Sequence, residues 1–284
     1  MKITEKQAIA EQLREYCELK GSQNKAAATI KGVSSATLSQ VLNEKWELIT
    51  DEMWRNIASQ IGYDARKWVV VETEGYSRMY NIMRDAQENS LVFAITGDAG
   101  CGKTQAIQAY ARRNKNTLAL SCSEFWNRKQ FLHELLTEIG VEASGGTVAE
   151  MMGEVVYQLK RKENVLIVLD EADKLSDQVL YFFITLYNKL EDHCGIIICA
   201  TQYLEKRIKR GVQNNRKGYK EIFSRVGRKF IPMPVVSSED IAAVCIANGV
   251  DSKDSIEEVI DDCDCDLRRV KRLVHAVKQS LKSA

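Results

Sequence analysis

Apolar residues recur with two different periods along the chain. Residues 91–96, 117–121, 164–170 and 195–200 are short runs dominated by Val, Ile, Leu and Ala, as expected of strands buried on both faces of a parallel sheet. Between these runs apolar residues return every three or four positions, which is the spacing of amphipathic helices. Residues 75–230 therefore predict alternating strands and helices around a parallel sheet.

The flanking regions carry only the helical pattern. Four helices are expected near the start of the chain: 4–20, 23–30, 36–43 and 51–62. Ser22 and Thr50 are expected to cap two of them, because a hydroxyl oxygen accepts a hydrogen bond from the first backbone N–H groups. Beyond Pro232 and Pro234, which mark a boundary, residues 235–284 also predict helices alone.

These patterns divide the chain into four parts. They are an all-α domain (1–62), a linker (63–75), an α/β core (76–233) and a small helical region (234–284). A short strand at residues 69–71 is an alternative to part of the linker, since all three residues are valine. The expected fold class is thus α/β with a parallel sheet, preceded by an all-α domain.

The run 91–96 ends in a phosphate-binding sequence of the form G-x-x-x-x-G-K-T. Its residues are Gly97, Asp98, Ala99, Gly100, Cys101, Gly102, Lys103 and Thr104. A strand is expected before this sequence and a helix after it, which is the context that a phosphate loop requires. Glycines let backbone N–H groups turn toward phosphates, and the helix N-terminus adds partial positive charge. We expect ATP here, with Lys103 on its β- and γ-phosphates and Thr104 on Mg²⁺.

Two further strands end in polar residues that complete such a site. Asp170 and Glu171 follow the run 164–170, and the carboxyl ends of parallel strands are where ligands bind. We expect Asp170 beside the magnesium and Glu171 as the base that polarises an attacking water. Thr201 follows the next run, where its hydroxyl could contact the γ-phosphate or could merely cap the next helix.

The chain is nearly neutral overall, with a net charge of +1, but one segment of it is strongly basic. Forty Lys and Arg against thirty-nine Asp and Glu exclude a uniformly basic coat, so any nucleic-acid surface must be local. Residues 204–230 hold ten basic and two acidic residues, and a mobile polar loop is expected at 211–218. The candidate DNA contacts are Lys209, Arg210, Arg216 and Lys217, with Arg128 and Lys129 as a second group. Solvated surface charge is the alternative for both groups.

Composition also limits the cellular setting. The sequence has 45% hydrophobic and 28% charged residues, without an apolar run long enough to span a bilayer. The eight cysteines lack the spacing of a zinc site, so reduced structural thiols are expected. The N-terminal segment shows no signal-peptide core, which favours a cytoplasmic protein without membrane partners.

Over residues 75–284 the chain resembles the AAA+ ATPases. The resemblance lies in the phosphate loop, the Asp-Glu strand, the polar residue after the next strand and the C-terminal helices, which would form the lid. It implies that Arg225, or alternatively Arg228, is the arginine finger that completes a neighbouring subunit's site. Arg268 resembles the lid's sensor arginine, although Cys265 stands where the family has glycine. The plainer interpretation is that Arg225 and Arg268 are surface residues on amphipathic helices.

Residues 1–62 resemble helix-turn-helix domains of the phage-repressor type. The resemblance implies that the second helix of the motif enters the major groove, with polar residues toward base edges and lysines near phosphates. Those residues are Ser34, Ser35, Thr37 and Gln40 for bases, and Lys25, Lys31 and Lys45 for phosphates. Eight basic and eight acidic residues leave this region neutral, so a bundle for protein contacts is the alternative.

Together the two regions resemble the transposition ATPases related to the Mu transposition protein B. The resemblance implies ATP-dependent self-assembly on double-stranded DNA, DNA-stimulated ATP hydrolysis, and delivery of target DNA to a transposase in a bacterial or phage setting. Two alternatives share the motifs: a replication initiator or helicase loader, and a nucleotide-switched transcription regulator. The intact Asp170-Glu171 pair argues against a switch that does not hydrolyse ATP.

Overall fold

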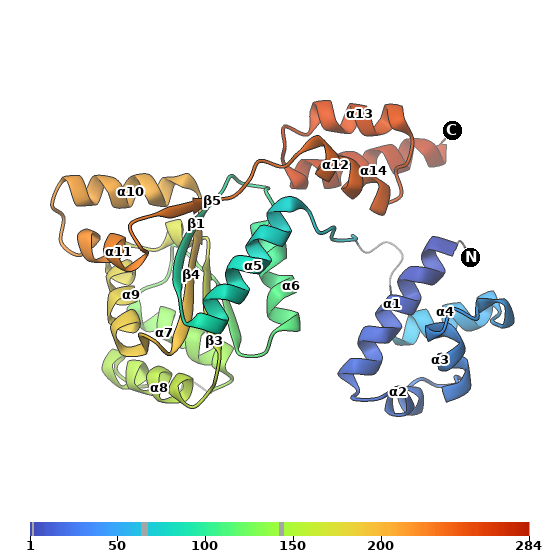
Figure 1. The fold of residues 1–284 in the computed structure, drawn as a ribbon, viewed down its shortest axis with the longest axis horizontal. Helices are drawn as coiled ribbons and strands as arrows, with labels where there is room; N and C mark the ends of the chain where they lie inside the picture. Colours follow the sequence, from blue (N-terminus) through green and yellow to red (C-terminus); the bar gives the residue numbers. More distant parts are fainter. Residues whose placement is uncertain (2, 64–67, 142–144, 284) are drawn as a thin grey trace. The chain divides into compact units, whose positions relative to one another are not determined.

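The computed structural model describes residues 1, 3–63, 68–141 and 145–283, and the chain divides into two compact units, Met1–Val69 and Val70–Ala284 (Figure 1). Residues 64–67 of the expected linker lie outside the described residues. Residues 69–71 form no strand, which removes that alternative. Helix α5 begins at Glu74, inside the range expected to be linker, because the Thr73 hydroxyl caps it by accepting from the Tyr76 N–H.

The first unit is a small helical domain. Its elements are α1 (Ile3–Leu19), α2 (Gln23–Thr29), α3 (Ser35–Leu42), the 3₁₀ turn η1 (Trp46–Leu48) and α4 (Asp51–Gln60). Ser22 and Thr50 cap α2 and α4, as predicted. Leu13, Leu38 and Trp54 are fully buried, so α1, α3 and α4 share one core.

The turn between α2 and α3 is held from α4. Asn56 and Gln60 donate side-chain amide hydrogen bonds to the Lys31 carbonyl at 3.2 and 2.9 Å, and the Lys31 N–H donates to Gln60 at 2.8 Å. Gly32 follows with φ of 74°, a left-handed conformation that glycine adopts without a Cβ clash. The geometry between α2 and α3 thus depends on three side-chain contacts from α4.

The second unit is built on a five-stranded parallel sheet with the order β2-β3-β4-β1-β5. Its strands are β1 (Val92–Thr96), β2 (Thr117–Ser121), β3 (Val165–Asp170), β4 (Cys194–Ala200) and β5 (Phe230–Pro232). Every residue of β3 and β4 is buried, as continuous apolar runs predict for central parallel strands.

Helices cover both faces of this sheet. In Figure 1, α5 (Glu74–Asn89) and α6 (Lys103–Arg113) lie on one face, and α7 (Arg128–Ile139), α8 (Val148–Lys160) and α9 (Asp177–Leu190) lie on the other. The short turn η2 (Ala172–Lys174) connects β3 to α9, while α10 (Gln202–Gln213) and α11 (Tyr219–Arg225) connect β4 to β5. The chain ends with α12 (Ser238–Ala247), α13 (Lys253–Asp262) and α14 (Leu267–Ser283).

The polar loop expected at residues 211–218 is shorter in the structure. Helix α10 continues to Gln213, and Gly211 lies buried inside it. A Cβ at Gly211 would come within 2.3 Å of the Tyr219 ring, so this glycine serves the packing of α10 against α11 and does not open a loop. The expectation failed because the contact that requires glycine comes from a residue eight positions away.

Candidate nucleotide site and basic surface

The phosphate loop connects β1 to α6 through two left-handed glycines. Gly100 and Gly102 have φ of 81° and 92°, a region where a side chain would be strained. The Lys103 ammonium donates to the carbonyl oxygens of Gly97 at 2.7 Å and Asp98 at 2.8 Å. The loop therefore curls around the lysine head group at the N-terminus of α6, where a phosphate would also be attracted.

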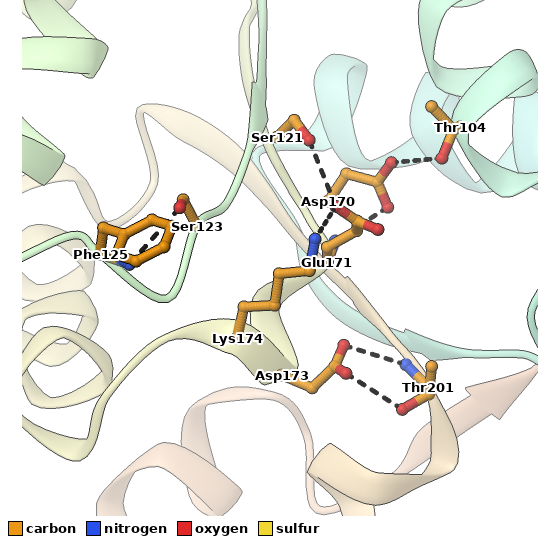
Figure 2. Close-up of polar contacts among 9 residues, drawn as sticks. All are labelled: Thr104, Ser121, Ser123, Phe125, Asp170, Glu171, Asp173, Lys174 and Thr201. Carbon is orange, nitrogen blue, oxygen red and sulfur yellow. Dashed lines mark hydrogen bonds and ion pairs between the residues drawn. The ribbon is translucent and has the colours of Figure 1, made fainter.

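The strand order brings the second motif beside this loop. The Thr104 hydroxyl donates to Oδ2 of Asp170 at 2.7 Å, across a sequence separation of 66 residues (Figure 2). Asp170 is 4% exposed, and burial raises the pKa of its carboxyl, while the Thr104 and Glu171 hydrogen bonds act in the opposite direction. A buried carboxylate next to a hydroxyl is an all-oxygen donor set, which suits Mg²⁺.

Glu171 follows Asp170 in a left-handed conformation with φ of 55°. Its Oε2 accepts from the Lys174 ammonium at 2.6 Å and from the Ser121 hydroxyl at 3.5 Å (Figure 2). The hydrogen bond to Glu171 raises the pKa of Lys174. The carboxylate thus sits at the C-terminal edge of the sheet, between the ends of β2 and β3, and carries a lysine ion pair.

Thr201 stands at the end of β4, on the same edge of the sheet. Its hydroxyl accepts from the Tyr203 N–H at 3.3 Å, so the capping interpretation of this residue is confirmed. The same hydroxyl donates to Oδ2 of Asp173 at 3.2 Å, and the Thr201 N–H donates to Oδ1 at 3.3 Å (Figure 2). Contact of Thr201 with a γ-phosphate stays a prediction.

The C-terminal helices contact the phosphate loop directly. The Leu267 N–H donates to the Gly100 carbonyl at 3.0 Å. A Cβ on Gly100 would lie 1.8 Å from the Asp266 carboxylate, so only glycine permits this approach. Arg268, the second residue of α14, is exposed, and its N–H donates to Asp266 at 2.7 Å. The sensor role of Arg268 stays a prediction, although the first residue of its helix, α14, contacts the phosphate loop.

The two arginine-finger candidates differ in their surroundings. The Arg225 guanidinium donates twice to Asn188 on α9, at 3.1 and 2.9 Å, and stacks 5.4 Å from the Tyr187 ring. Arg228 is exposed, and its guanidinium has no hydrogen bond or ion pair within the part of the chain that the structure describes. Of the two candidates, Arg228 therefore has the guanidinium whose N–H groups have no partner among the described residues.

In the basic segment after β4, some of the candidate DNA contacts form ion pairs within the protein and others do not. Lys209 is paired with Glu205 at 2.6 Å, and Arg216 lies 3.8 Å from Asp177. Arg210 and Lys217 are exposed without an ion pair to any described residue. The second group is also exposed, because Arg128 and Lys129 form the first turn of α7, where Asn127 provides the cap.

In the helical domain, two of the candidate base-contacting residues, Ser34 and Thr37, form hydrogen bonds that cap α3. The Ser34 hydroxyl caps α3 by accepting from the Thr37 N–H at 3.1 Å and lies 2.9 Å from the Thr37 hydroxyl. Ser35 and Lys45 are exposed, and Gln40 is half-buried. DNA contact by any of these residues stays a prediction.

Several residues of this site carry no motif that would have revealed them. Ser121, Asp173 and Lys174 contact the predicted residues Glu171 and Thr201. Lys174 follows Glu171 at a spacing of three, which is compatible with an ion pair on a helical turn but is common in surface sequences. The Asp173–Thr201 contact needs neighbouring strands and has no local signal.

Comparisons with known proteins agree with this geometry. Residues 84–208 match a family model described as an AAA domain. The chain is 23% identical to the Mu-like prophage FluMu DNA transposition protein B of Haemophilus influenzae over 81% of each protein. It is also 23% identical to the ATP-dependent target DNA activator B of Escherichia phage Mu, over 86% of this chain and 79% of that protein.

Solved structures extend the likeness of fold. The ORC1 protein of Aeropyrum pernix, determined in complex with DNA, has a TM-score of 0.55 at 16% identity and covers 84% of this chain and 65% of its own. NtrX from Brucella abortus in complex with ATP has a TM-score of 0.50 at 18% identity, over 86% and 59%. At these identities the likeness concerns the fold.

Among the described residues, no helix is both long enough and apolar enough to cross a bilayer. The match to the AAA domain agrees with the parallel sheet and the phosphate loop, which are both features of a P-loop fold. The chain has an AAA+ P-loop fold, carries an AAA domain and is a homologue of the Mu transposition B proteins over most of its length.

Proposed function

We propose that this protein is a magnesium-dependent ATPase that assembles on double-stranded DNA and presents that DNA to a transposase. The observation that carries the ATPase proposal is the contact of Thr104 with Asp170 at 2.7 Å. It joins the phosphate loop to the strand that ends in Glu171, so groups for phosphate, metal and water lie at one edge of the sheet.

The proposed roles follow from position and chemistry. Lys103 and the backbone from Gly97 to Thr104 would hold the phosphates, and Glu171 would accept a proton from the attacking water. Thr104 and Asp170 would hold Mg²⁺, which when bound neutralises charge on the β- and γ-phosphates. Lys103 would exchange its loop carbonyl partners, at 2.7 and 2.8 Å, for phosphate oxygens.

The DNA part of the proposal is supported by relatives and by charge. Two relatives are named ATP-dependent target DNA activators, and another is named a DNA transposition protein. The exposed residues Arg210 and Lys217 belong to the basic segment and are available to neutralise phosphates. We extend the relatives' role in transposition to this chain, in the cytoplasm of a bacterial or phage-infected cell.

Self-assembly is the remaining part of the proposal. An arginine that acts on a neighbouring subunit's γ-phosphate must be exposed and free to donate, since the transition state spreads charge over several oxygens. Arg228 meets both conditions, and Arg225 would first have to leave Asn188. We therefore propose that ATP binds between adjacent copies of the chain and stabilises the DNA-bound assembly.

The test is duplex-DNA binding by Lys103→Ala with and without ATP and Mg²⁺. We expect the wild type to bind duplex DNA more tightly with ATP, and Lys103→Ala to lose that increase because it cannot retain the phosphates. Lys115→Ala is the matched control, since this exposed lysine lies just beyond the C-terminus of α6. DNA affinity of Lys103→Ala that still rises with ATP contradicts the proposal.

A further inference from the structure

A polar cluster connects the turn that carries Glu171 to the basic segment. Arg207 of α10 donates to the Leu175 carbonyl at 2.8 Å and to the Asp173 carbonyl at 3.4 Å, so its guanidinium holds the backbone of the η2 turn. The same guanidinium donates to Oδ1 of Asp177, at the start of α9, and its side chain is 16% exposed. Arg207 thus joins α10 to the turn between β3 and α9.

Tyr219 fixes the other side of this cluster. Its hydroxyl donates to Oδ1 of Asp177 at 2.7 Å and accepts from Arg207 at 3.3 Å. The Tyr219 ring is 1% exposed, and it lies against Gly211 and edge-on to the Tyr181 ring at 6.0 Å. Rigid packing of this kind makes the position of Asp177 depend on α9, α10 and α11 together.

The second oxygen of Asp177 faces the basic segment. Oδ2 lies 3.8 Å from the Arg216 guanidinium, whose side chain is 61% exposed. Burial raises the pKa of Asp177, but hydrogen bonds from Arg207 and Tyr219 and the two guanidinium charges hold it below its ordinary value. One carboxylate is therefore shared between the half-buried Arg207 and the exposed Arg216.

We propose that Arg207 is a positioning residue for the Glu171 turn and that DNA phosphates act on it by withdrawing Arg216 from the carboxylate of Asp177. This proposal rests on the ATPase and DNA-binding function proposed above. The Arg216 guanidinium is held by a half-exposed ion pair at 3.8 Å and by the face of the Tyr219 ring at 5.8 Å, and both contacts are weak enough for a DNA phosphate to compete with them. With its competitor gone, Asp177 binds Arg207 more strongly and the turn that bears Glu171 becomes more rigid.

Substitution of Arg216 should raise ATP hydrolysis, although it removes a basic residue from the proposed DNA surface. Arg216→Gln removes the competing charge permanently, so it imitates the DNA-bound state at Asp177. We expect the DNA-free kcat for ATP hydrolysis to rise by about threefold or more, with KM for ATP unchanged, and added duplex DNA to give little further increase. Lys220→Gln is the matched control, because it removes one exposed charge nearby that does not pair with any described residue.

Two variants on the buried side should have the opposite effect. Tyr219→Phe keeps the ring and removes the hydroxyl. Arg207→Lys keeps the charge, but three donors on a single nitrogen cannot replace a planar guanidinium that donates to four acceptors. Both should lower kcat with and without DNA and abolish the stimulation, with KM for ATP changed by less than about twofold. A purely structural role would instead lower the amount of folded enzyme and leave the stimulation ratio intact.

Amide hydrogen exchange over residues 171–177 tests the inference without hydrolysis. We expect slower exchange in Arg216→Gln than in the wild type without DNA or nucleotide, and faster exchange in Tyr219→Phe. The inference is overturned if Arg216→Gln and Lys220→Gln show the same amide exchange and the same DNA-free kcat. A wild type that neither hydrolyses ATP nor binds a duplex oligonucleotide refutes the proposed function, while the exchange comparison still decides whether Asp177 is shared.

Discussion

The Lys174 ammonium lies 2.6 Å from Oε2 of Glu171, within the turn that follows β3. The two side chains are 45% and 39% exposed, so water screens the pair and competes for both partners. We expect Lys174→Met to change the free energy of unfolding by less than about 1 kcal/mol. Urea denaturation of the two proteins measures this, and a loss well beyond that bound would show that the pair supports the fold.

Glu171→Gln should separate nucleotide binding from hydrolysis. Glutamine keeps the shape of the side chain but cannot accept a proton from water, so kcat should fall by about a hundredfold or more while ATP still binds. If hydrolysis releases DNA, this variant stays on duplex DNA in the presence of ATP. Dissociation from DNA as fast as that of the wild type, measured by chasing with unlabelled duplex, would contradict the release model.

Asp177 should contribute a pH-dependent part of the stability. Its pKa is lower in the folded protein than its ordinary value of 3.8, so its contribution is present above that value and is lost as the pH falls through the folded pKa. Asp177→Asn should therefore be less stable than the wild type at neutral pH, and the difference should shrink near pH 3.8 and below. Thermal unfolding across this range, in both proteins, checks the sign.

Gly100→Ala should weaken nucleotide binding. The new Cβ would overlap the Asp266 carboxylate at 1.8 Å and would require a side chain at φ of 81°, so the contact between loop and C-terminal helices must open. We expect ATP affinity to fall by about tenfold or more. The control is Gly153→Ala within α8, where a Cβ meets no atom within 4 Å and should stabilise the helix by about 1 kcal/mol.

Arg228→Ala should abolish hydrolysis only in assembled protein. Its free guanidinium would act on a neighbour's phosphates, and such an arginine contributes on the order of 10³-fold to kcat. Mixing Arg228→Ala with Glu171→Gln should restore part of the activity. At some interfaces of the mixed assembly, the Arg228→Ala subunit supplies an intact Glu171 and the Glu171→Gln subunit supplies an intact Arg228. The same mixture made with Arg225→Ala is the comparison, and rescue by that pair alone would assign the finger to Arg225.

Local sequence was sufficient for the phosphate loop and for most elements, but not for the end of α10 or the start of α5. The strands β1 and β3 are continuous apolar runs, and the helices of the first unit are bounded by glycines and by Ser22 and Thr50. These signals act over a few residues, because backbone dihedrals, caps and side-chain periodicity are local properties. The Asp170-Glu171 pair was found for the same reason, since a buried parallel strand presents its C-terminal residues at the edge of the sheet.

Only the tertiary structure decided which polar groups meet. Thr104 reaches Asp170 across 66 residues, although β4 lies between β1 and β3 in the sheet, and Asp173 reaches Thr201 across 28, because β3 and β4 are neighbouring strands. Charge counting marked residues 204–230, which include Arg207 and Arg216, as a basic segment without distinguishing the two arginines. Packing separated them, because it leaves the Arg207 side chain only 16% exposed against the turn that bears Glu171 and the Arg216 side chain 61% exposed.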